Sequence, residues 1–246
     1  MSTSKLSPTI LAIETATSAC SVALSHQGAI IDLHEVGNNI HSGVLLGMVH
    51  QLLSEAGLTV SELDAVAVGQ GPGSFTGLRI GVGVAQGLAY GAGCKMIGIS
   101  SLAVLAQSLA SAADFSTGST SSTSILAGID ARMGEVYWAE FSMQSQSVKL
   151  ESELVVGAPS QIACSQPRFH LVGNAWSEYW DEVSEGIRKN GIVEASQIYP
   201  SAVALLTLAN EKFVANELTE VTSFKPIYVR NDVAKKSTKS LPGKRV

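Results

Sequence analysis

The first third of the chain alternates short apolar runs with segments whose apolar residues recur at helical spacing. Residues 9–13, 21–25 and 29–36 are short apolar runs, and the last two are separated by the turn-like residues 26–28. Runs bounded in this way predict β-strands. Strands that follow one another so closely have to pair antiparallel, because a parallel pair needs a crossover of about a dozen residues or more.

The pattern then changes to a helical period. We interpret Ser42 as an N-cap and Gly57 as the stop of a helix whose apolar residues recur three and four positions apart. These residues are Val44, Leu45, Met48, Val49, Leu52 and Leu53. The pattern further predicts a strand at 63–68, a helix at 76–91, a strand at 95–99 and a helix that Ser100 or Ser101 caps and that runs through residue 109. Three strands followed by helix, strand, helix, strand and helix is the ribonuclease H-like order, on which the lobes of actin, hexokinase and Hsp70 are built.

The second half repeats this opening in a weaker form. Residues 116–124 contain only Ser, Thr and Gly and predict a flexible linker. After them come predicted strands at 125–130, 135–141, 148–155 and 169–172 and helices near 176–189 and 203–218. We therefore predict an α/β protein with an actin-like fold of two ribonuclease H-like lobes, the second degenerate. Its parts are a first lobe (1–112), a smaller second lobe (113–200), a C-terminal helix (about 201–218) that packs back on the first lobe, and a mobile basic tail (234–246).

Composition narrows the class of protein. Of 246 residues, 46% are hydrophobic and 15% are charged, which is typical of a compact, ordered chain. A net charge of -5 argues against a dedicated nucleic-acid binder. The weakly polar stretch at 80–94 is shorter than the roughly 20 residues of a membrane span, and we see no signal peptide, so we expect a cytoplasmic protein without a membrane segment. The three cysteines form no C-x-x-C pair and predict neither a disulfide framework nor a thiolate zinc site.

Two loops at strand ends are candidates for binding. Residues 14–18 (ETATS) offer an acid and small hydroxyls that could face a metal-bound nucleotide, although side-chain bonds to the backbone of a tight turn explain them equally well. Residues 71–77 (GPGSFTG) could hold an anion at a helix start, although a plain strand-to-helix turn is the slightly favoured interpretation. The candidate residues of a vestigial nucleotide site are Glu14, Thr15, Thr17, Ser18, Gly71, Gly73, Ser74 and Thr76.

The helix after the glycine loop is unusually rich in glycine. Gly77 and Gly81 are four apart, as are Gly83, Gly87 and Gly91. Each costs about 1 kcal/mol relative to alanine, so a compensating contact is expected. That contact is either close packing on the protein's own sheet or a helix-on-helix interface with another chain. The candidate interface residues are Val44, Leu45, Met48, Val49, Leu52, Leu78, Val82, Gly83, Gln86, Gly87 and Tyr90.

Catalytic constellations are not seen in the sequence. No two of the five histidines are three or four residues apart, so no helical metal pair can be drawn. For Asp130 and Arg132 the favoured interpretation is an ion pair at a strand end. We assign no catalytic and no metal-binding residue.

At this point the sequence resembles a known family. Residues 10–24, 71–81 and 129–138 are similar to three signatures of the TsaB (YeaZ) family, and 229–234 and 241–244 resemble the tail of its proteobacterial members. One departure is Glu14, where many members have Asp. The resemblance implies a paralogue of TsaD, which transfers a threonylcarbamoyl group to the adenosine beside the tRNA anticodon. It places Ser101 and Leu105 at the positions of TsaD's metal-binding histidine pair.

The resemblance therefore implies a non-catalytic scaffold for TsaD, with TsaE as a further partner, required for N6-threonylcarbamoyladenosine in tRNA. It implies a homodimer when alone, an interface on the N-terminal helices, and indirect contact with tRNA. No cofactor is expected to bind tightly, and ATP or ADP is expected only in the complex with TsaD and TsaE. The alternatives are a metallopeptidase-like (M22 glycoprotease) enzyme, a small-molecule kinase of the same fold, and an interaction protein outside tRNA modification.

Overall fold

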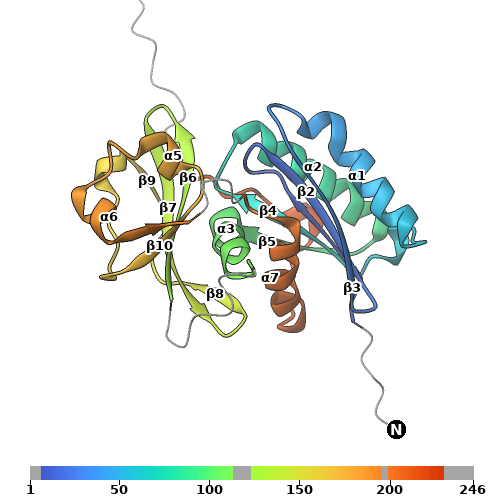
Figure 1. Ribbon diagram of the computed structural model, residues 1–246. Helices are drawn as coiled ribbons and strands as arrows, with labels where there is room; N and C mark the ends of the chain where they lie inside the picture. Colours follow the sequence, from blue (N-terminus) through green and yellow to red (C-terminus); the bar gives the residue numbers. More distant parts are fainter. Residues whose placement is uncertain (1–6, 113–122, 195–198, 230–246) are drawn as a thin grey trace, which may run out of the picture.

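The computed structural model describes residues 7–112, 123–194 and 199–229, which fold around two mixed sheets (Figure 1). The first sheet has the order β3-β2-β1-β4-β5. β1 pairs antiparallel with β2 and parallel with β4, and β2 and β3 form a hairpin, as the closely spaced apolar runs predict. The strands are β1 (Ile10–Glu14), β2 (Ala19–His26), β3 (Ala29–Val36), β4 (Ala65–Gly71) and β5 (Lys95–Ser100).

The central strand β1 is buried on both faces. Leu11 and Ile13 pack in one apolar cluster with helices α1 (His41–Glu55) and α2 (Phe75–Ala92). Ile10 and Ala12 pack in a second cluster with α7 (Ala202–Val214). Successive side chains of a strand point to opposite faces, so β1 joins the two layers of helices through one sheet.

The second sheet repeats the first. Its order is β11-β10-β6-β7-β8, with β6 antiparallel to β7 and parallel to β10, and β9 also pairs with β7. The strands are β6 (Ser124–Arg132), β7 (Glu135–Gln144), β8 (Ser147–Leu150), β9 (Val155–Gly157), β10 (Phe169–Val172) and β11 (Gly191–Val193). Each lobe thus has two strands of an antiparallel meander on one side of its first strand and two parallel strands on the other. This is the predicted pair of ribonuclease H-like lobes in an actin-like arrangement.

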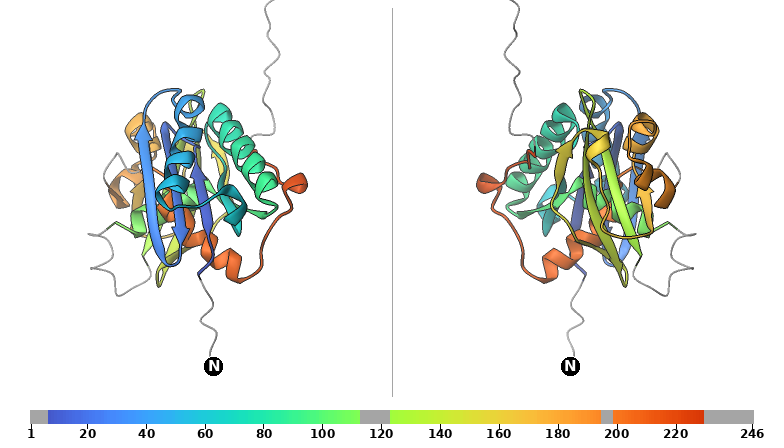
Figure 2. Two further views of the ribbon diagram at one scale, coloured as in Figure 1. Left: turned by 90° about the vertical axis from the view of Figure 1, so that its right-hand side faces the viewer. Right: turned by 90° about the vertical axis from the view of Figure 1, so that its left-hand side faces the viewer.

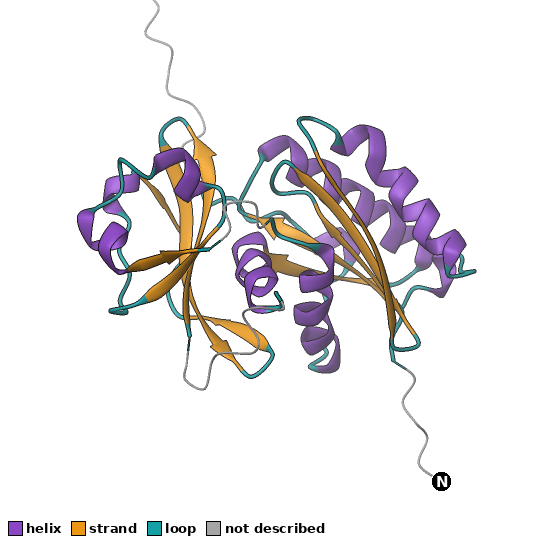
Figure 3. Ribbon diagram, viewed as in Figure 1, coloured by secondary structure: helices purple, strands orange, loops and turns teal. Residues whose placement is uncertain are grey.

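Helix α3 (Ser101–Ala110) lies between the lobes. Its residues Leu102, Leu105 and Leu109 pack with β6, β7 and β10 of the second lobe, whereas Val104 packs with α7 against the first sheet. Short helices α5 (Ala175–Tyr179) and α6 (Glu185–Asn190) cover the outer face of the second sheet. The layers therefore run α1 and α2, first sheet, α3 and α7, second sheet, α5 and α6 (Figure 3).

Several predicted boundaries are wrong. Ile40 is the N-cap of α1 and makes no side-chain cap bond, and Ser42 lies inside the helix. The predicted strand at 148–155 is two strands, β8 and β9, and the helix at 176–189 is two helices, α5 and α6. The three-residue strand β11 was not predicted, because so short a run carries no period. The predicted linker at 116–124 and the basic tail at 234–246 lie outside the described residues, apart from Thr123 and from Ser124, the first residue of β6.

Single-turn 3-10 helices lie at η1 (Val60–Glu62), η2 (Pro159–Gln161) and η3 (Val221–Ser223). η3 belongs to a C-terminal strap, residues 219–229, that follows α7 and runs along the first lobe. Thr219 bridges to Met96 at the edge of the first sheet, and Gln86 of α2 donates to the carbonyls of Val221 and Phe224, both at 3.3 Å. In the described ranges, no helix has both the length and the apolar character needed to cross a membrane.

Candidate functional site

A cleft of about 700 Å³ opens between the two lobes. Its walls come from the segments that follow β1, β4 and β10, from the last residues of β6, from the loop 37–42 and from the end of the strap at 227–229. Ligands of α/β proteins bind outside the carboxyl ends of the parallel strands, and the cleft lies at these ends in both lobes.

The wall on the first lobe is lined with small polar groups. Of the predicted nucleotide-site residues, Thr17, Ser18, Gly73, Ser74 and Thr76 do line the cleft. Ser74 caps α2 by accepting a hydrogen bond from the Gly77 N–H at 3.3 Å, and its own N–H donates to the Ala16 carbonyl at 2.7 Å. The two loops are therefore joined by a backbone hydrogen bond.

The acid of the first loop does not face the cleft. Glu14 is fully buried, and its carboxylate accepts hydrogen bonds from the Ala16 N–H at 2.7 Å and the Ser101 hydroxyl at 3.1 Å. Its carboxyl group fills the space beside Gly69, where a Cβ atom would collide with it. Burial raises its pKa to about 7, against the lowering effect of these hydrogen bonds. The prediction that Glu14 approaches a metal-bound nucleotide is corrected by this inward orientation.

Thr15 and Gly71 are also buried behind the wall. The Thr15 hydroxyl donates to the Gly77 carbonyl at 2.9 Å, which ties the first loop to the first turn of α2. Gly71 has a φ of +101°, and a Cβ atom there would lie 2.9 Å from the Ile227 carbonyl oxygen of the strap. Both residues therefore shape the loops from behind, and neither lines the cleft.

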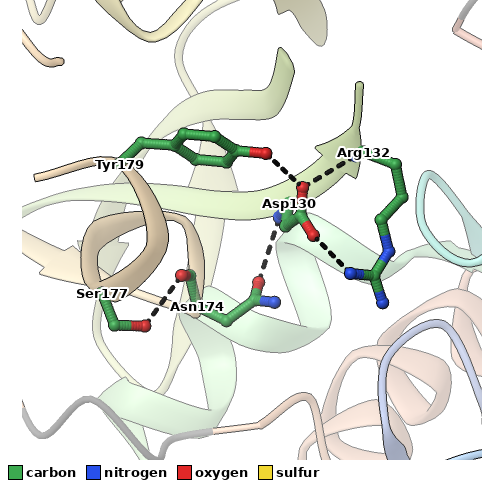
Figure 4. Close-up of polar contacts among 5 residues, drawn as sticks. All are labelled: Asp130, Arg132, Asn174, Ser177 and Tyr179. Carbon is green, nitrogen blue, oxygen red and sulfur yellow. Dashed lines mark hydrogen bonds and ion pairs between the residues drawn. The ribbon is translucent and has the colours of Figure 1, made fainter. Parts of the chain in front are cut away.

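The wall on the second lobe contains an ordered ion pair (Figure 4). Asp130 lies at the end of β6 with its side chain 6% exposed, and Arg132 Nη1 approaches its carboxylate at 3.1 Å, which confirms the predicted ion pair. The same carboxylate accepts from the Tyr179 hydroxyl at 2.8 Å and the Arg132 N–H at 2.7 Å. The Asp130 N–H donates to the Asn174 side chain at 3.0 Å. Burial and the hydrogen bond to Asp130 both favour the neutral Tyr179 hydroxyl, and together they raise the pKa of Tyr179 to about 12.

An aromatic edge of the cleft combines Phe75 from α2 with Tyr228 from the strap, and no local pattern in the sequence indicates it. Tyr228 and Phe75 line the cleft and are each about half exposed, with ring centroids 6.1 Å apart. The Arg79 guanidinium lies 3.7 Å from the centre of the Phe75 ring, and its Nε donates to the Tyr228 hydroxyl at 3.4 Å. Residues 219–229 have no hydrophobic period, and the side chains that hold them are distant in sequence.

The predicted interface residues are divided between the core and the surface. The apolar stripe of α1 and its counterparts on α2 are buried in the first lobe's own core, because this stripe covers the sheet. This corrects the prediction for Leu45, Met48, Val49, Leu52, Leu78 and Val82. Val44 is half-buried against the same core, and Gln86 is half-buried and bonded to the strap. Gly83, Gly87 and Tyr90 are exposed.

The glycines of α2 also fall into two groups. A Cβ atom on Gly77 or Gly81 would collide with Thr15, so these two glycines pack on the protein's own first loop. A Cβ atom on Gly83, Gly87 or Gly91 would have no atom within 4 Å among the described residues, so packing inside the chain does not explain them.

The neighbouring helix α1 has open glycines of its own. Gly43 and Gly47 are equally free of close neighbours in the described ranges, and Leu46 between them is 62% exposed. α1 and α2 lie side by side on the outside of the first lobe (Figure 2). We call the surface formed by Gly43, Leu46, Gly47, Gly83, Gly87, Tyr90 and Gly91 the glycine face. The sequence analysis did not single out its α1 residues, although their four-residue spacing could have indicated them.

Histidine, cysteine, aspartate and glutamate side chains do not gather for a metal in residues 7–112, 123–194 and 199–229, where no cluster of three lies close enough together. Ser101 and Leu105 are both buried in α3, and Leu105 packs against the second lobe.

Comparison with known proteins identifies relatives of nearly the same length. The sequence model of the family "TsaD: tRNA N6-adenosine threonylcarbamoyltransferase" matches residues 35–237. The "tRNA threonylcarbamoyladenosine biosynthesis protein TsaB" of Escherichia coli is 37% identical, over 96% of this chain and 99% of its own. The Haemophilus influenzae protein of the same name is 35% identical over 96% and 98%. The solved structure "YeaZ from Pseudomonas aeruginosa" superposes with a TM-score of 0.81 at 35% identity, over 90% of this chain and 99% of that one.

Proposed function

The chain belongs to the TsaB (YeaZ) family, and on that premise we propose that it is a non-catalytic scaffold subunit in the formation of N6-threonylcarbamoyladenosine next to the anticodon of tRNAs. In this proposal it binds TsaD, together with TsaE, and holds TsaD in an active arrangement in the cytoplasm. It contacts tRNA indirectly, through the complex. In this proposal the chain is required for the reaction without carrying it out.

The observation that carries the non-catalytic role is the pair Ser101 and Leu105. These residues stand where the resemblance places the metal-binding histidines of TsaD, and neither a buried leucine nor a serine hydroxyl bonded to Glu14 offers a metal ligand of that kind. A metallopeptidase would need such a ligand set to bind a metal that polarises its substrate. This disfavours the M22-like alternative.

The glycine face supports the choice of docking surface. Five exposed glycines within two adjacent helices cost about 1 kcal/mol each in helix propensity. No contact within the described residues offsets this loss of helix stability. A helix of another subunit could offset it by approaching the surface closely, as helices do at small-residue stripes. Leu46 and Tyr90 flank the glycines and provide apolar area for such a contact. In our proposal the same face forms the homodimer in the absence of TsaD and the heterodimer in its presence.

Nucleotide binding belongs to the complex in this proposal. The first-loop acid is turned into the core, so the isolated chain offers poor support for a metal-bound triphosphate. ATP or ADP would be held only where TsaD and TsaE contribute to the site. This also disfavours the small-molecule kinase alternative.

Reconstitution tests the proposal. Threonylcarbamoylation of tRNA would be measured with the carbamoyl-adenylate synthase, TsaD, TsaE, ATP, threonine and bicarbonate, with and without this chain. We expect modification to require the chain. If it proceeds equally well without it, the scaffold role is wrong for this protein.

A further inference from the structure

Strand β3 forms one margin of the first sheet, and within the described ranges its outer edge pairs with no other strand (Figure 2). Its inner edge pairs with β2 from Ala29 to Val36 without a break in register, so the strand is regular over its whole length. Natural proteins block such edges with lysine, proline or a β-bulge, because the free N–H and C=O groups otherwise pair with another chain. The sequence of β3, AIIDLHEV, contains none of these devices. Its outer edge is therefore suited to pairing with a further strand.

The backbone groups at this edge belong to the even-numbered residues of β3. The Gly37 N–H donates to the Ser18 carbonyl at 3.0 Å, which continues the β2–β3 ladder by one residue. In an antiparallel pair, the N–H and C=O groups of successive residues point to alternate edges of the strand. The odd-numbered residues therefore bond to β2. The residues that present N–H and C=O groups at the outer edge are Ile30, Asp32, His34 and Val36.

The side chains of these four residues share one face of the sheet. Asp32 lies opposite Ala23 of β2, which packs in the apolar cluster with α7, and opposite residues of an antiparallel pair point to the same face. Ile30 is 48% exposed and Val36 is 52% exposed, and Asp32 and His34 between them are exposed as well. The edge thus carries an acid and a histidine between two apolar side chains.

This pattern is complementary to itself. A twofold axis through Leu33, perpendicular to the sheet, would place Asp32 of each copy opposite His34 of the other copy, and Ile30 opposite Val36. An imidazole N–H can donate to a carboxylate, and a protonated ring adds the opposite charge. Each of the four pairs joins residues whose backbone groups point outward, so each pair exchanges two backbone hydrogen bonds.

The neighbouring registers are less favourable. An axis through Asp32 would place the two Asp32 carboxylates opposite each other, and like charges at directly opposite positions are destabilising. An axis through His34 would oppose the two His34 rings and place Asp32 against the apolar Val36. The charge pattern therefore selects the register that is centred on Leu33.

We propose that the outer edge of β3 is a self-association surface, on which a second copy of this chain adds its own β3 antiparallel and extends the first sheet. Asp32 and His34 set the register of this contact. The surface is separate from the glycine face, so the proposal does not depend on the scaffold role, and either proposal can fail alone.

The first test is sedimentation equilibrium of the full chain with the substitution Gly87→Leu, so that contact through the glycine face does not contribute. We expect a reversible dimer at concentrations up to about 1 mM. Adding Asp32→Lys should raise its dissociation constant about three- to thirtyfold, because both symmetry-related pairs lose their attraction. Combining Asp32→Lys with His34→Asp restores opposite charges and should restore the affinity. Asp181→Lys, at an exposed position between α5 and α6, is the matched control and should leave the dissociation constant unchanged.

The second test locates the contact by amide hydrogen exchange, measured by NMR at a low and a high protein concentration. The outward N–H groups of Asp32 and His34 should be protected only at the high concentration, whereas those of Ile31 and Leu33, which bond to β2, should be protected at both. The proposal is overturned if the Gly87→Leu chain stays monomeric, if Asp32→Lys associates as tightly as its parent, or if the protection of the outward N–H groups does not depend on concentration. Protection at both concentrations would show that another segment of the same chain covers the edge.

Discussion

The hydroxyl of Ser101, in the first turn of α3, donates a hydrogen bond of 3.1 Å to the buried carboxyl group of Glu14 at the end of β1. The two residues are 87 positions apart in the sequence, and the contact fixes the first loop with its acid turned away from the cleft. Ser101 stands where the resemblance places a metal-binding histidine of TsaD. A contact that stabilises the loop thus occupies the position of a metal ligand.

Glu14 should make the stability of the protein depend on pH. Its pKa is raised from 4.5 to about 7 in the folded chain, so the folded state holds a proton that the unfolded state has lost. The stability from the protonated form is fully present below about pH 4.5 and is lost as the pH rises to about 7. The loss is on the order of 3 kcal/mol. Urea unfolding at a series of pH values measures it.

The variant Glu14→Gln isolates this effect, because its amide is neutral at every pH and can still accept from Ala16 N–H. The difference in unfolding free energy between the variant and the parent chain should grow in favour of the variant between pH 4.5 and 7 and be constant above. A difference that stays constant across this range would show that Glu14 titrates normally.

Gly81→Ala should destabilise the first lobe. The added methyl group would collide with the Thr15 hydroxyl, which is itself bonded to the Gly77 carbonyl. Overpacking of this kind costs about 1–3 kcal/mol, more than the gain in helix propensity. The midpoint of urea unfolding should fall, and an unchanged or raised midpoint would mean that the first loop yields easily.

Gly87→Ala should have the opposite effect on stability. Its methyl group would meet no described atom within 4 Å, so only the helix propensity changes and the isolated chain should gain about 1 kcal/mol. The same substitution should weaken binding to TsaD, measured by calorimetry, because it roughens the glycine face. A variant that is more stable and also binds as tightly as the parent chain would place the interface elsewhere.

Gln107 should be a large contributor to the contact between the lobes. Its side-chain amide, 1% exposed, accepts from the Val148 N–H at 3.0 Å and donates to the Gln146 carbonyl at 2.9 Å, which attaches the β7–β8 hairpin to α3. Gln107→Leu removes both hydrogen bonds, each of which contributes about 0.5–1.5 kcal/mol to stability. Thermal unfolding should show this loss. Gln51→Leu, on the exposed surface of α1, should change stability by less than about 0.5 kcal/mol. An equal loss of stability in Gln107→Leu and Gln51→Leu would show that Gln107 does not stabilise the contact between the lobes.

The fold could be predicted from the sequence because the local spacing of apolar residues indicates the order of strands and helices. The apolar runs before Val36, the helical stripe of α1 and the glycine that follows it all act over a few residues. Elements without a period were missed or merged. The break between β8 and β9 is of this kind, since residues 151–154 continue the apolar run only in part.

The site could be predicted only in part, because side-chain direction depends on distant residues. Whether Glu14 faces the cleft is decided by Gly69, which leaves room for the carboxyl group, and by Ser101, which binds it. The apolar stripe of α1 looks the same in the sequence whether it covers the protein's own sheet or another chain. Burial of Leu45 and exposure of Leu46 separate the two, and no local pattern fixes that division.

The most direct test of the scaffold role is the reconstituted tRNA modification reaction with three variants of this chain. Gly87→Leu places a large side chain on the glycine face, Glu211→Leu places the same side chain on the exposed surface of α7, and Ser101→Ala removes the hydroxyl at the histidine position. We predict that Gly87→Leu remains folded and abolishes modification. Glu211→Leu and Ser101→Ala should support modification at the parent rate, at a temperature at which both variants are folded. Full activity of Gly87→Leu, or loss of activity in a folded Ser101→Ala, would contradict the account of a non-catalytic scaffold that acts through this face.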